Sequence, residues 1–498
     1  MRKLIAGLLA AGLLAAVSVL AAPPKKQTTL SAATQECLSC HRELTPGLVR
    51  DWENSRHARV TPREGLKKAR LERRISNEKI APALMGTVVG CAECHTQNPG
   101  DHKDTFEHNG YQVHVVVTPR DCAACHSLEV EQYGQNIMAR AYGNLMHNPV
   151  YRSLAEDVNA SASFREKRLQ LTKPDDLTNA DSCLFCHGTV VEVQGLKSRE
   201  TAQGEMEFPV LTGWPSQGVG RVNPDGTLGS CSPCHSRHGY SIEVARKPDT
   251  CSKCHKGPDV PAYPVYQVSK HGSLYASQNK DWDLKAVPWK VGKDFNAPTC
   301  AACHVSLITG DGGKVVAERT HRMNDRLPWR LFGLIYAHSH PKEADTTVIR
   351  NKAGLPLPTH FSGEEATPFL IDEKEKARRH QKLQEVCLSC HSQSWVNGHF
   401  QRLDRAIQTT NQMTLAATEV MSAIWAEGLA QGLAQNASPF DEAVEKKWIE
   451  QWLFYANSTR LASAMMGADY GVFANGRWYL RKNLQELVEW LGEIEKRR

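Results

Sequence analysis

The sequence predicts a mainly α-helical protein in which short helices and long loops precede a bundle of long C-terminal helices. Two observations lead to this fold class. Eight copies of the pattern Cys-x-x-Cys-His are spread between residues 37 and 391, and little regular apolar periodicity surrounds them. After residue 400 no such unit occurs, and apolar residues recur at the three- and four-residue spacing of amphipathic helices.

All 16 cysteines belong to these units, so none is left over for a disulfide. The units are Cys37-Cys40-His41, Cys91-Cys94-His95, Cys122-Cys125-His126, Cys183-Cys186-His187, Cys231-Cys234-His235, Cys251-Cys254-His255, Cys300-Cys303-His304 and Cys387-Cys390-His391. This pattern is the signature of c-type haem attachment, in which both thiols bond to the haem and the histidine is the proximal iron ligand. One unit alone would also fit half of a zinc site. Eight units that use every cysteine instead predict eight covalently attached haem c groups, with a core made largely of porphyrin.

The histidines are numerous enough to ligate both faces of the haems. Of the 21 histidines, the eight within the units leave 13 for the distal faces. An iron with two histidines is coordinatively full and suits electron transfer, whereas an iron with an open position can bind and transform a small molecule. The number of histidines alone does not decide whether one haem is open.

The N-terminus has the features of an export signal. Arg2 and Lys3 precede an apolar run that ends in small residues at about Ala21. A membrane anchor is the alternative, because the apolar run is barely long enough to span a bilayer. We therefore expect a periplasmic or otherwise exported protein that is soluble after signal removal. The predicted divisions are a signal peptide at 1–21, an octahaem domain at 22–400 and a helical C-terminal bundle at 401–498.

Composition bears on the class of partner. The chain is 41% apolar and has a formal net charge of +6. One possible partner is nucleic acid, because the chain has a basic cluster made of Lys67, Lys68, Arg70, Arg73 and Arg74. In an exported protein a solvated helix face or an anion-attracting surface fits better. No nucleic-acid partner is predicted.

The C-terminal region predicts three helices that are suited to oligomerisation. The first carries Leu403, Ile407, Val420, Met421 and Ile424 and ends near the segment QNASPF. The second is expected to be capped by Asp441 and carries Val444, Trp448, Trp452 and Tyr455, while the third carries Leu484, Leu487, Val488, Leu491 and Ile494. Before them, the charged segment 341–380 contains Pro and Gly and is expected to be a surface excursion.

The eight units and their intervals, the segments SRHGYSIEVARKP, GPD and SKHG, and the helical C-terminus resemble the octahaem hydroxylamine oxidoreductases over nearly the whole chain. In that family the active haem is on the fourth unit and the others are bis-histidine. The resemblance therefore implies an open haem on Cys183, Cys186 and His187. By position it implies that the distal ligands include His57, His147, His238, His271 and His321, with His114 or His108 as a further one; His114 is included in the predicted ligand set.

Two positions depart from the family pattern. The family places an Asp-His pair over the open iron, and this sequence has Asp259 followed by Val260, which cannot carry a proton. Its oxidative members attach a tyrosine from a neighbouring subunit to the active porphyrin. Alignment on Asn475-Gly476 puts Phe473 at that position, although a different register would supply Tyr470. Phenylalanine has no phenol oxygen, so Phe473 cannot form this crosslink. Family members that lack the crosslink resemble reductases of nitrite or hydroxylamine.

The resemblance therefore implies reduction of nitrite, and of hydroxylamine, to ammonium at the fourth haem, with Asp259 as proton donor. Hydroxylamine oxidation to nitric oxide or nitrite is one alternative, and a non-catalytic electron conduit is another. A related enzyme of sulfur oxyanions is disfavoured, because those enzymes replace a proximal histidine by lysine and all eight units here keep it. The family also implies a homotrimer. A membrane quinol dehydrogenase or a small soluble cytochrome would be the redox partner.

Overall fold

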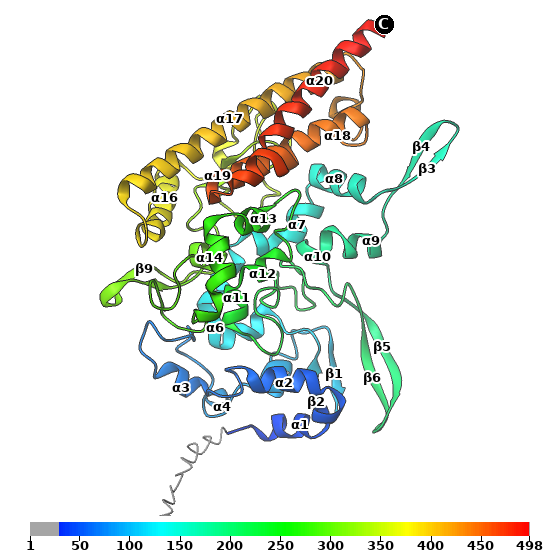
Figure 1. The fold of residues 1–498 in the computed structure, drawn as a ribbon. Helices are drawn as coiled ribbons and strands as arrows, with labels where there is room; N and C mark the ends of the chain where they lie inside the picture. Colours follow the sequence, from blue (N-terminus) through cyan, green and yellow to red (C-terminus); the bar gives the residue numbers. More distant parts are fainter. Residues whose placement is uncertain (1–28, 498) are drawn as a thin grey trace, which may run out of the picture.

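The computed structural model describes residues 29–497, so the predicted signal peptide at 1–21 lies outside the described residues. A body of short helices, small hairpins and long loops joins a group of long C-terminal helices (Figure 1). The predicted fold class is confirmed. Within the described part of the chain, no helix is both long enough and apolar enough to span a bilayer.

The N-terminal half of the body is built from short elements. Its helices are α1 (Ala32–Leu44), α2 (Pro46–Asn54), α3 (Pro62–Leu66), α4 (Pro82–Met85), α5 (Cys91–His95), α6 (Pro119–Gly134), α7 (Ala141–Met146), α8 (Pro149–Asn159), α9 (Asp176–Asp181) and α10 (Cys183–His187). Its strands form three antiparallel hairpins, β1 (Thr105–His108) with β2 (Tyr111–His114), β3 (Ser161–Arg165) with β4 (Arg168–Thr172), and β5 (Glu192–Thr201) with β6 (Gly204–Thr212).

The second half of the body continues in the same style before the long helices begin. Its helices are α11 (Ile242–Arg246), α12 (Pro248–Ser252), α13 (Ala262–Gln267), α14 (Lys270–Gln278) and α15 (Cys300–His304). Its strands are β7 (Trp289–Lys290), β8 (Ile308–Thr309) and β9 (Val315–Ala317) in one sheet, and β10 (Trp329–Arg330) paired with β11 (His338–Ser339). The C-terminal helices are α16 (Glu373–Leu388), α17 (Gln393–Ala426), α18 (Ala443–Ile449), α19 (Asn457–Met465) and α20 (Arg477–Arg497), with π-helical segments at Glu450–Ala456 and Tyr470–Ala474.

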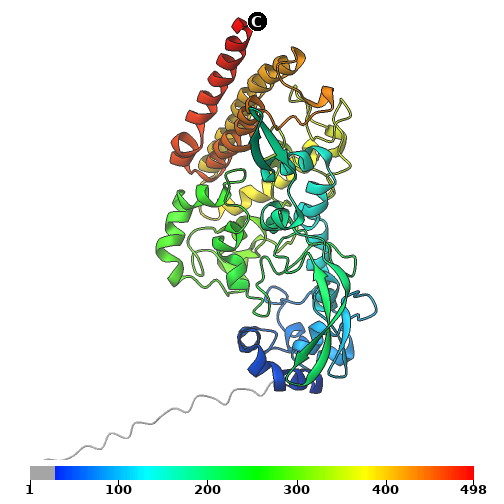
Figure 2. The same ribbon diagram turned by 90° about the vertical axis from the view of Figure 1, so that its right-hand side faces the viewer.

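The C-terminal helices pack around a core of large side chains. The side chains of Met421, Ile424, Trp448, Trp452 and Leu487 are almost fully buried and belong to one cluster. This cluster joins α17, α18 and α20 with the π-helical segment between α18 and α19, and Figures 1 and 2 show α17 and α20 side by side. The helix-bundle interpretation of these residues therefore holds.

Two boundaries differ in detail from the sequence-based expectation. Helix α18 follows Glu442 rather than Asp441, because the Glu445 carboxylate accepts a 3.0 Å hydrogen bond from the Glu442 amide and satisfies that free N–H. The predicted domain boundary at residue 400 falls inside α17, which is continuous from Gln393 to Ala426. The division into two domains stays a prediction.

The segment 341–380 is not a simple surface excursion. Leu357 and Thr359 are almost fully buried, and Leu355 and Phe361 pack against the core of the C-terminal helices. The Asn351 side chain donates 2.9 Å to the carbonyl of Thr359, which closes the segment on itself. A few apolar residues among the charged ones therefore fix this loop to the bundle.

The β3–β4 hairpin projects from the body on the same side as β5–β6 (Figures 1 and 2). Its register places Ala162 opposite Leu171 and Phe164 opposite Leu169, so one face of the hairpin is entirely apolar. That face is open to solvent, because Phe164 is 72% exposed and Leu169 is 70% exposed. An isolated two-stranded hairpin is marginally stable in water, which makes this face a candidate contact surface.

Candidate haem centres and active site

Most Cys-x-x-Cys-His units lie on a short helix. Units two, four and seven coincide with α5, α10 and α15, and the first and third lie within α1 and α6. Residues three and four apart share one side of a helix, so both thiols and the imidazole of a unit face the same way. None of the 16 cysteines forms a disulfide. This donor set fits covalent attachment of a haem at each unit.

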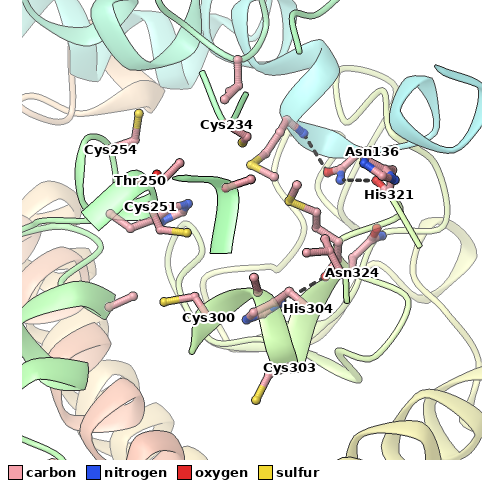
Figure 3. A pocket seen from close by; sticks show the side chains of 18 of the residues that line it. Asn136, Cys234, Thr250, Cys251, Cys254, Cys300, Cys303, His304, His321 and Asn324 are labelled. Atoms are coloured by element: carbon pink, nitrogen blue, oxygen red, sulfur yellow. Dashed lines mark hydrogen bonds between the residues drawn. The ribbon is translucent and has the colours of Figure 1, made fainter. Parts of the chain in front are cut away.

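A large internal cavity of about 1810 Å³ runs through the body. It is lined by both cysteines and the histidine of each of units three to eight, and by Cys94 of the second unit. Ordinary single-ligand pockets hold roughly 300–1,000 Å³, so the cavity has room for more than one large group. Figure 3 shows Cys251, Cys254, Cys300, Cys303 and His304 around one opening.

Hydrogen bonds fix several proximal histidines in the orientation that iron ligation needs. The Nδ1 atoms of His95, His187 and His304 lie 2.8, 3.2 and 3.2 Å from the backbone carbonyls of His114, Ala141 and Met323. A carbonyl only accepts, so each Nδ1 donates and each Nε2 is left free for a metal. Burial also lowers the pKa of these three imidazoles and favours the neutral form that binds iron.

Four proximal histidines face a second imidazole at one common distance. The ring centroids are 6.2 Å apart for His41 and His108, 6.2 Å for His126 and His57, 6.5 Å for His235 and His321, and 6.1 Å for His391 and His271. Two imidazoles on opposite sides of one iron, each bonded at about 2 Å, place their ring centres about 6 Å apart. This spacing is what bis-histidine ligation at units one, three, five and eight requires.

The surroundings of the second unit are more complex. The rings of His95 and His114 are 6.0 Å apart, but the His114 carbonyl also accepts the Nδ1 bond of His95, which puts His114 on the proximal side. His238 lies near enough to His95 for their charges to interact. The distal ligand of this unit stays a prediction between His114 and His238, while His108 faces the first unit.

A buried charge cluster that the sequence did not reveal lies behind His114. The ring of His102 stacks on His114 at 3.6 Å, and its nitrogens lie 3.4 Å from Asp104 and 3.2 Å from Asp121. Burial alone would lower the pKa of His102, but the two carboxylates outweigh it and raise the pKa to about 9. His102, Asp104 and His114 are also close enough together to hold a metal ion. No pattern in the sequence brings these side chains together.

The fourth, sixth and seventh units have no facing imidazole among residues 29–497. His187 and His304 make no ring contact in this part of the chain, and the ring of His255 faces Phe332 at 6.4 Å. His147 lies exposed at the end of α7, against the edge of Tyr142 rather than over a proximal histidine. Its predicted role as a distal ligand is not tested. The missing imidazole at His187 agrees with an open fourth unit but does not single it out.

Chain geometry fixes the position of His187. Gly188 follows it with φ +92°, and a Cβ at Gly188 would lie 2.4 Å from the backbone nitrogen of Arg221. Only glycine fits this close approach of two chain segments. The imidazole is thereby held at the cavity wall between α10 and the Ala141 carbonyl.

Asp259 and Val260 line the same cavity as His187. The side-chain amide of Asn457, in α19, donates 3.0 Å to the Asp259 carbonyl and fastens this loop to the C-terminal helices. Burial raises the pKa of the Cys183 thiol, and the nearby Asp259 carboxylate raises it further. Asp259 therefore lies close to the fourth unit, whereas Asn457 had no signal in the sequence.

The two tyrosine-related positions face different ways. Phe473 is 66% exposed, and Val472 and Trp478, which are close to it in the sequence, are exposed as well. Tyr470 instead packs against its own chain, on the cluster of Val265 and Leu461. Of the two, Phe473 is the more exposed, since Tyr470 is half-buried.

Thiols of different units lie within reach of each other. Cys122 lies near Cys231, Cys186 lies near Cys254, and Cys251 lies near Cys300. The third unit is thus adjacent to the fifth, and the sixth is adjacent to both the fourth and the seventh. Groups attached at these cysteines would be close enough together for electron transfer along the chain.

Comparisons with known proteins agree with this arrangement. Residues 224–328 match the family described as seven times multi-haem cytochrome CxxCH, and residues 36–117 and 121–207 match cytochrome c554 and c-prime. A solved structure described as a hypothetical multiheme protein is 40% identical, with a TM-score of 0.89 over 95% of this chain and 98% of that chain. The chain belongs to the multihaem c-type cytochromes.

This multihaem cytochrome also shares its fold with a structure titled the Kuenenia stuttgartiensis reducing HAO-like protein complex Kustc0457/Kustc0458. That likeness has a TM-score of 0.61 at 17% identity and covers 93% of this chain and 85% of the other. The sequence-based resemblance to hydroxylamine oxidoreductase-like proteins is confirmed. A curated relative, the probable nitrite reductase-hydroxylamine oxidoreductase fusion protein of Kuenenia stuttgartiensis, is 24% identical over 413 residues, which are 81% of this chain. The match spans only 39% of that relative.

Proposed function

We propose that this multihaem cytochrome carries eight haem c groups and reduces nitrite, and hydroxylamine, to ammonium at the haem of the fourth unit. The observation that carries the proposal is the setting of His187. Among the described residues no imidazole faces it, while Asp259 lies close to the unit's cysteines and lines the same cavity. The other haems are assigned to electron supply.

The reaction consumes six electrons and eight protons for each nitrite, and releases one ammonium and two water molecules. Haem c at the fourth unit would supply an iron with an open position and one-electron redox chemistry. The chain's part is to hold His187 in the ligating tautomer and to deliver protons. Asp259 is the proposed proton donor, and Val260 contributes no second one.

The proposal that the enzyme reduces nitrite, rather than oxidising hydroxylamine, rests on Phe473. In the resemblance described above, the oxidative members need a tyrosine at this position, and the exposed ring here has no phenol oxygen. Tyr470 is half-buried and packs against Val265 and Leu461 of its own chain, so it is less available to a neighbouring subunit. The name of the curated relative, a probable nitrite reductase-hydroxylamine oxidoreductase fusion protein, is compatible with chemistry on nitrite.

We further propose that the protein is exported and forms a homotrimer. Two exposed apolar surfaces support association: the face of the β3–β4 hairpin with Phe164 and Leu169, and the patch around Phe473 and Trp478. Because they are different surfaces of one chain, their contact would be head-to-tail, and a rotation of one third of a turn between subunits would close it into a trimer. A membrane quinol dehydrogenase or a small soluble cytochrome is the proposed electron donor.

The test is anaerobic turnover of the fully haem-loaded protein with a low-potential donor and ¹⁵N-nitrite. The expected result is ¹⁵N-ammonium in a ratio of one to each nitrite consumed, with six electrons taken from the donor. The same preparation, given hydroxylamine and an oxidised acceptor, is expected to react slowly. Fast hydroxylamine oxidation with little nitrite reduction would overturn the proposed direction, and no activity in either assay would favour an electron conduit.

A further inference from the structure

Arg330 is a cation without an acidic partner among residues 29–497. It lies on β10, opposite His338 on β11, and its Nε donates 3.1 Å to the carbonyl of Phe332. The guanidinium carbon also lies 5.3 Å from the centre of the Phe332 ring. Among the described residues no carboxylate forms an ion pair with Arg330, and its two terminal nitrogens make no hydrogen bond.

Three other inward arginines have partners within the chain. Arg326 donates four hydrogen bonds to backbone carbonyls, and Arg319 pairs with Glu129 at 2.8 Å. Arg460 is likewise held by Thr410 and Asn411. Burying an unpaired charge is costly, so the free donors of Arg330 point to a partner outside the described residues.

Arg330 lies on the wall of the cavity that it shares with His187 and Asp259. After burial, its positive charge is a further cause of the lowered pKa of His187, and it acts in the same way on His338 and His340. Tyr151 of α8 lines the same region, interacts with the charge of Arg330, and makes no hydrogen bond through its phenol. Two sets of unused donors therefore lie near the fourth unit.

We propose that Arg330, assisted by the Tyr151 hydroxyl, forms a binding subsite for a small monoanion beside the fourth haem unit. A guanidinium presents parallel N–H donors that match a bent or linear anion with terminal acceptors, such as nitrite or azide. The inference rests on the proposed function, for which it supplies the group that selects the anionic substrate over the neutral one. Val260 and Phe332 also line this cavity and contribute only apolar surface to it.

A carboxylate of a bound haem is the other anion that this guanidinium could meet. A substrate anion and a haem carboxylate can be told apart by which properties change when Arg330 is replaced. A substrate subsite affects anionic ligands only, whereas a pairing with the haem itself would change the midpoint potential and affect every ligand equally.

The experiment compares wild type with Arg330→Gln, Arg330→Lys and Tyr151→Phe, all as haem-loaded protein. Azide binding to the oxidised protein, followed by its absorption spectrum, serves as the anionic probe and needs no turnover. Hydroxylamine, uncharged at pH 7.5, serves as the neutral probe. Arg319→Lys is the matched control, because Arg319 also lines the cavity but already has a carboxylate partner.

Arg330→Gln is expected to raise the Kd for azide and the KM for nitrite by roughly tenfold to hundredfold, the usual worth of a charged hydrogen bond. Arg330→Lys should fall between wild type and Arg330→Gln, Tyr151→Phe should have a smaller effect, and the KM for hydroxylamine should change less than about twofold. Equal losses for both probes, an unchanged azide Kd, or a shifted haem potential with azide binding intact would overturn the proposal. Arg330-dependent azide binding in a protein that reduces no nitrite would keep this inference and reject the proposed function.

Discussion

The side-chain amide of Asn457 holds the backbone carbonyl of Asp259 at 3.0 Å, and so connects the C-terminal helices to the candidate active site. The same amide donates 2.8 Å to the Leu453 carbonyl, and its oxygen accepts from Arg460. The helical bundle therefore does more than provide a contact surface. It positions the loop that carries the proposed proton donor.

Asn457→Ala is expected to lower nitrite turnover by moving this loop and to cost about 1–3 kcal/mol of stability through lost buried hydrogen bonds. Asn483→Ala is the matched control. Asn483 is equally buried in the same bundle and donates to Lys447 and Gln451, far in sequence from Asp259. Thermal melts and turnover would be measured together. Equal activity in the two variants would show that Asn457 supports the bundle only.

Asp259→Asn tests the proton donor directly. The amide keeps the size of the side chain and removes the transferable proton, so nitrite turnover is expected to fall by roughly a hundredfold while haem content stays constant. Asp249→Asn, an exposed carboxylate that contacts Tyr263 on the neighbouring helix, should leave turnover within twofold. Turnover of Asp259→Asn at the wild-type rate would exclude the proposed role.

Glu445 predicts a pH dependence of stability within the bundle. Its carboxylate is fully buried and accepts 2.8 Å from the indole of Trp425. Burial raises its pKa to about 7, and the charges of Asp441 and Glu442 contribute to the shift. A carboxyl group that binds its proton more tightly when folded loses stability as pH rises from about 4.5, its unfolded value, through 7.

Glu445→Gln removes that ionisation. Its stability relative to wild type is expected to rise between pH 5 and pH 8, by up to about 3 kcal/mol. Glu489→Gln, an exposed change on α20, should stay within about 0.5 kcal/mol at every pH. Melting temperatures at four pH values provide the measurement. A constant difference between Glu445→Gln and wild type would contradict the raised pKa.

The apolar face of the β3–β4 hairpin predicts where subunits meet. Phe164→Ser and Leu169→Ser are each expected to weaken association by roughly tenfold or more, since a buried side chain of this size contributes about 1.5–3 kcal/mol. Gln170→Ser changes the polar face of the same hairpin and should leave association intact. Sedimentation velocity across a dilution series measures the oligomeric state of each variant. A wild-type monomer, or the same assembly for all three variants, would reject this contact.

The number of attached haems is a further prediction, and it follows from the cysteines. Every cysteine lies in a unit and none forms a disulfide. Intact mass of the denatured chain is expected to show eight haem additions and no free thiol. Cys387→Ala with Cys390→Ala should remove one of them, whereas Ser389→Ala within the same unit should remove none. Fewer than eight additions in wild type would contradict the complete haem inventory.

Features that depend only on residues close together in the chain could be predicted from the sequence. The units specify attachment within five residues, and the apolar repeats after residue 400 specify helices whose core contains Met421, Ile424, Trp448 and Trp452. Local chemistry decides both. Segment 341–380 was misjudged because its charge and its Pro and Gly residues outweighed a few widely spaced apolar anchors, such as Leu357, whose burial depends on helices distant in sequence.

The candidate site was only partly predictable for the same reason. His187 and Asp259 follow from motifs, but the contact of Asn457 with Asp259 joins residues 198 positions apart. Arg330 is one arginine among many until the fold shows that it faces the cavity without a partner. Pairing of His41 with His108, rather than with His114, likewise depends on the register of the β1–β2 hairpin.

If the fourth haem has an open iron at which nitrite is reduced, the spin state of that iron should respond to nitrite. Oxidised, fully haem-loaded protein would be titrated with nitrite and followed by electron paramagnetic resonance. We expect a high-spin haem that nitrite converts to low spin, with the conversion weakened in Arg330→Gln. A spectrum of low-spin haems only, unchanged by nitrite, would contradict it and identify the protein as an electron conduit.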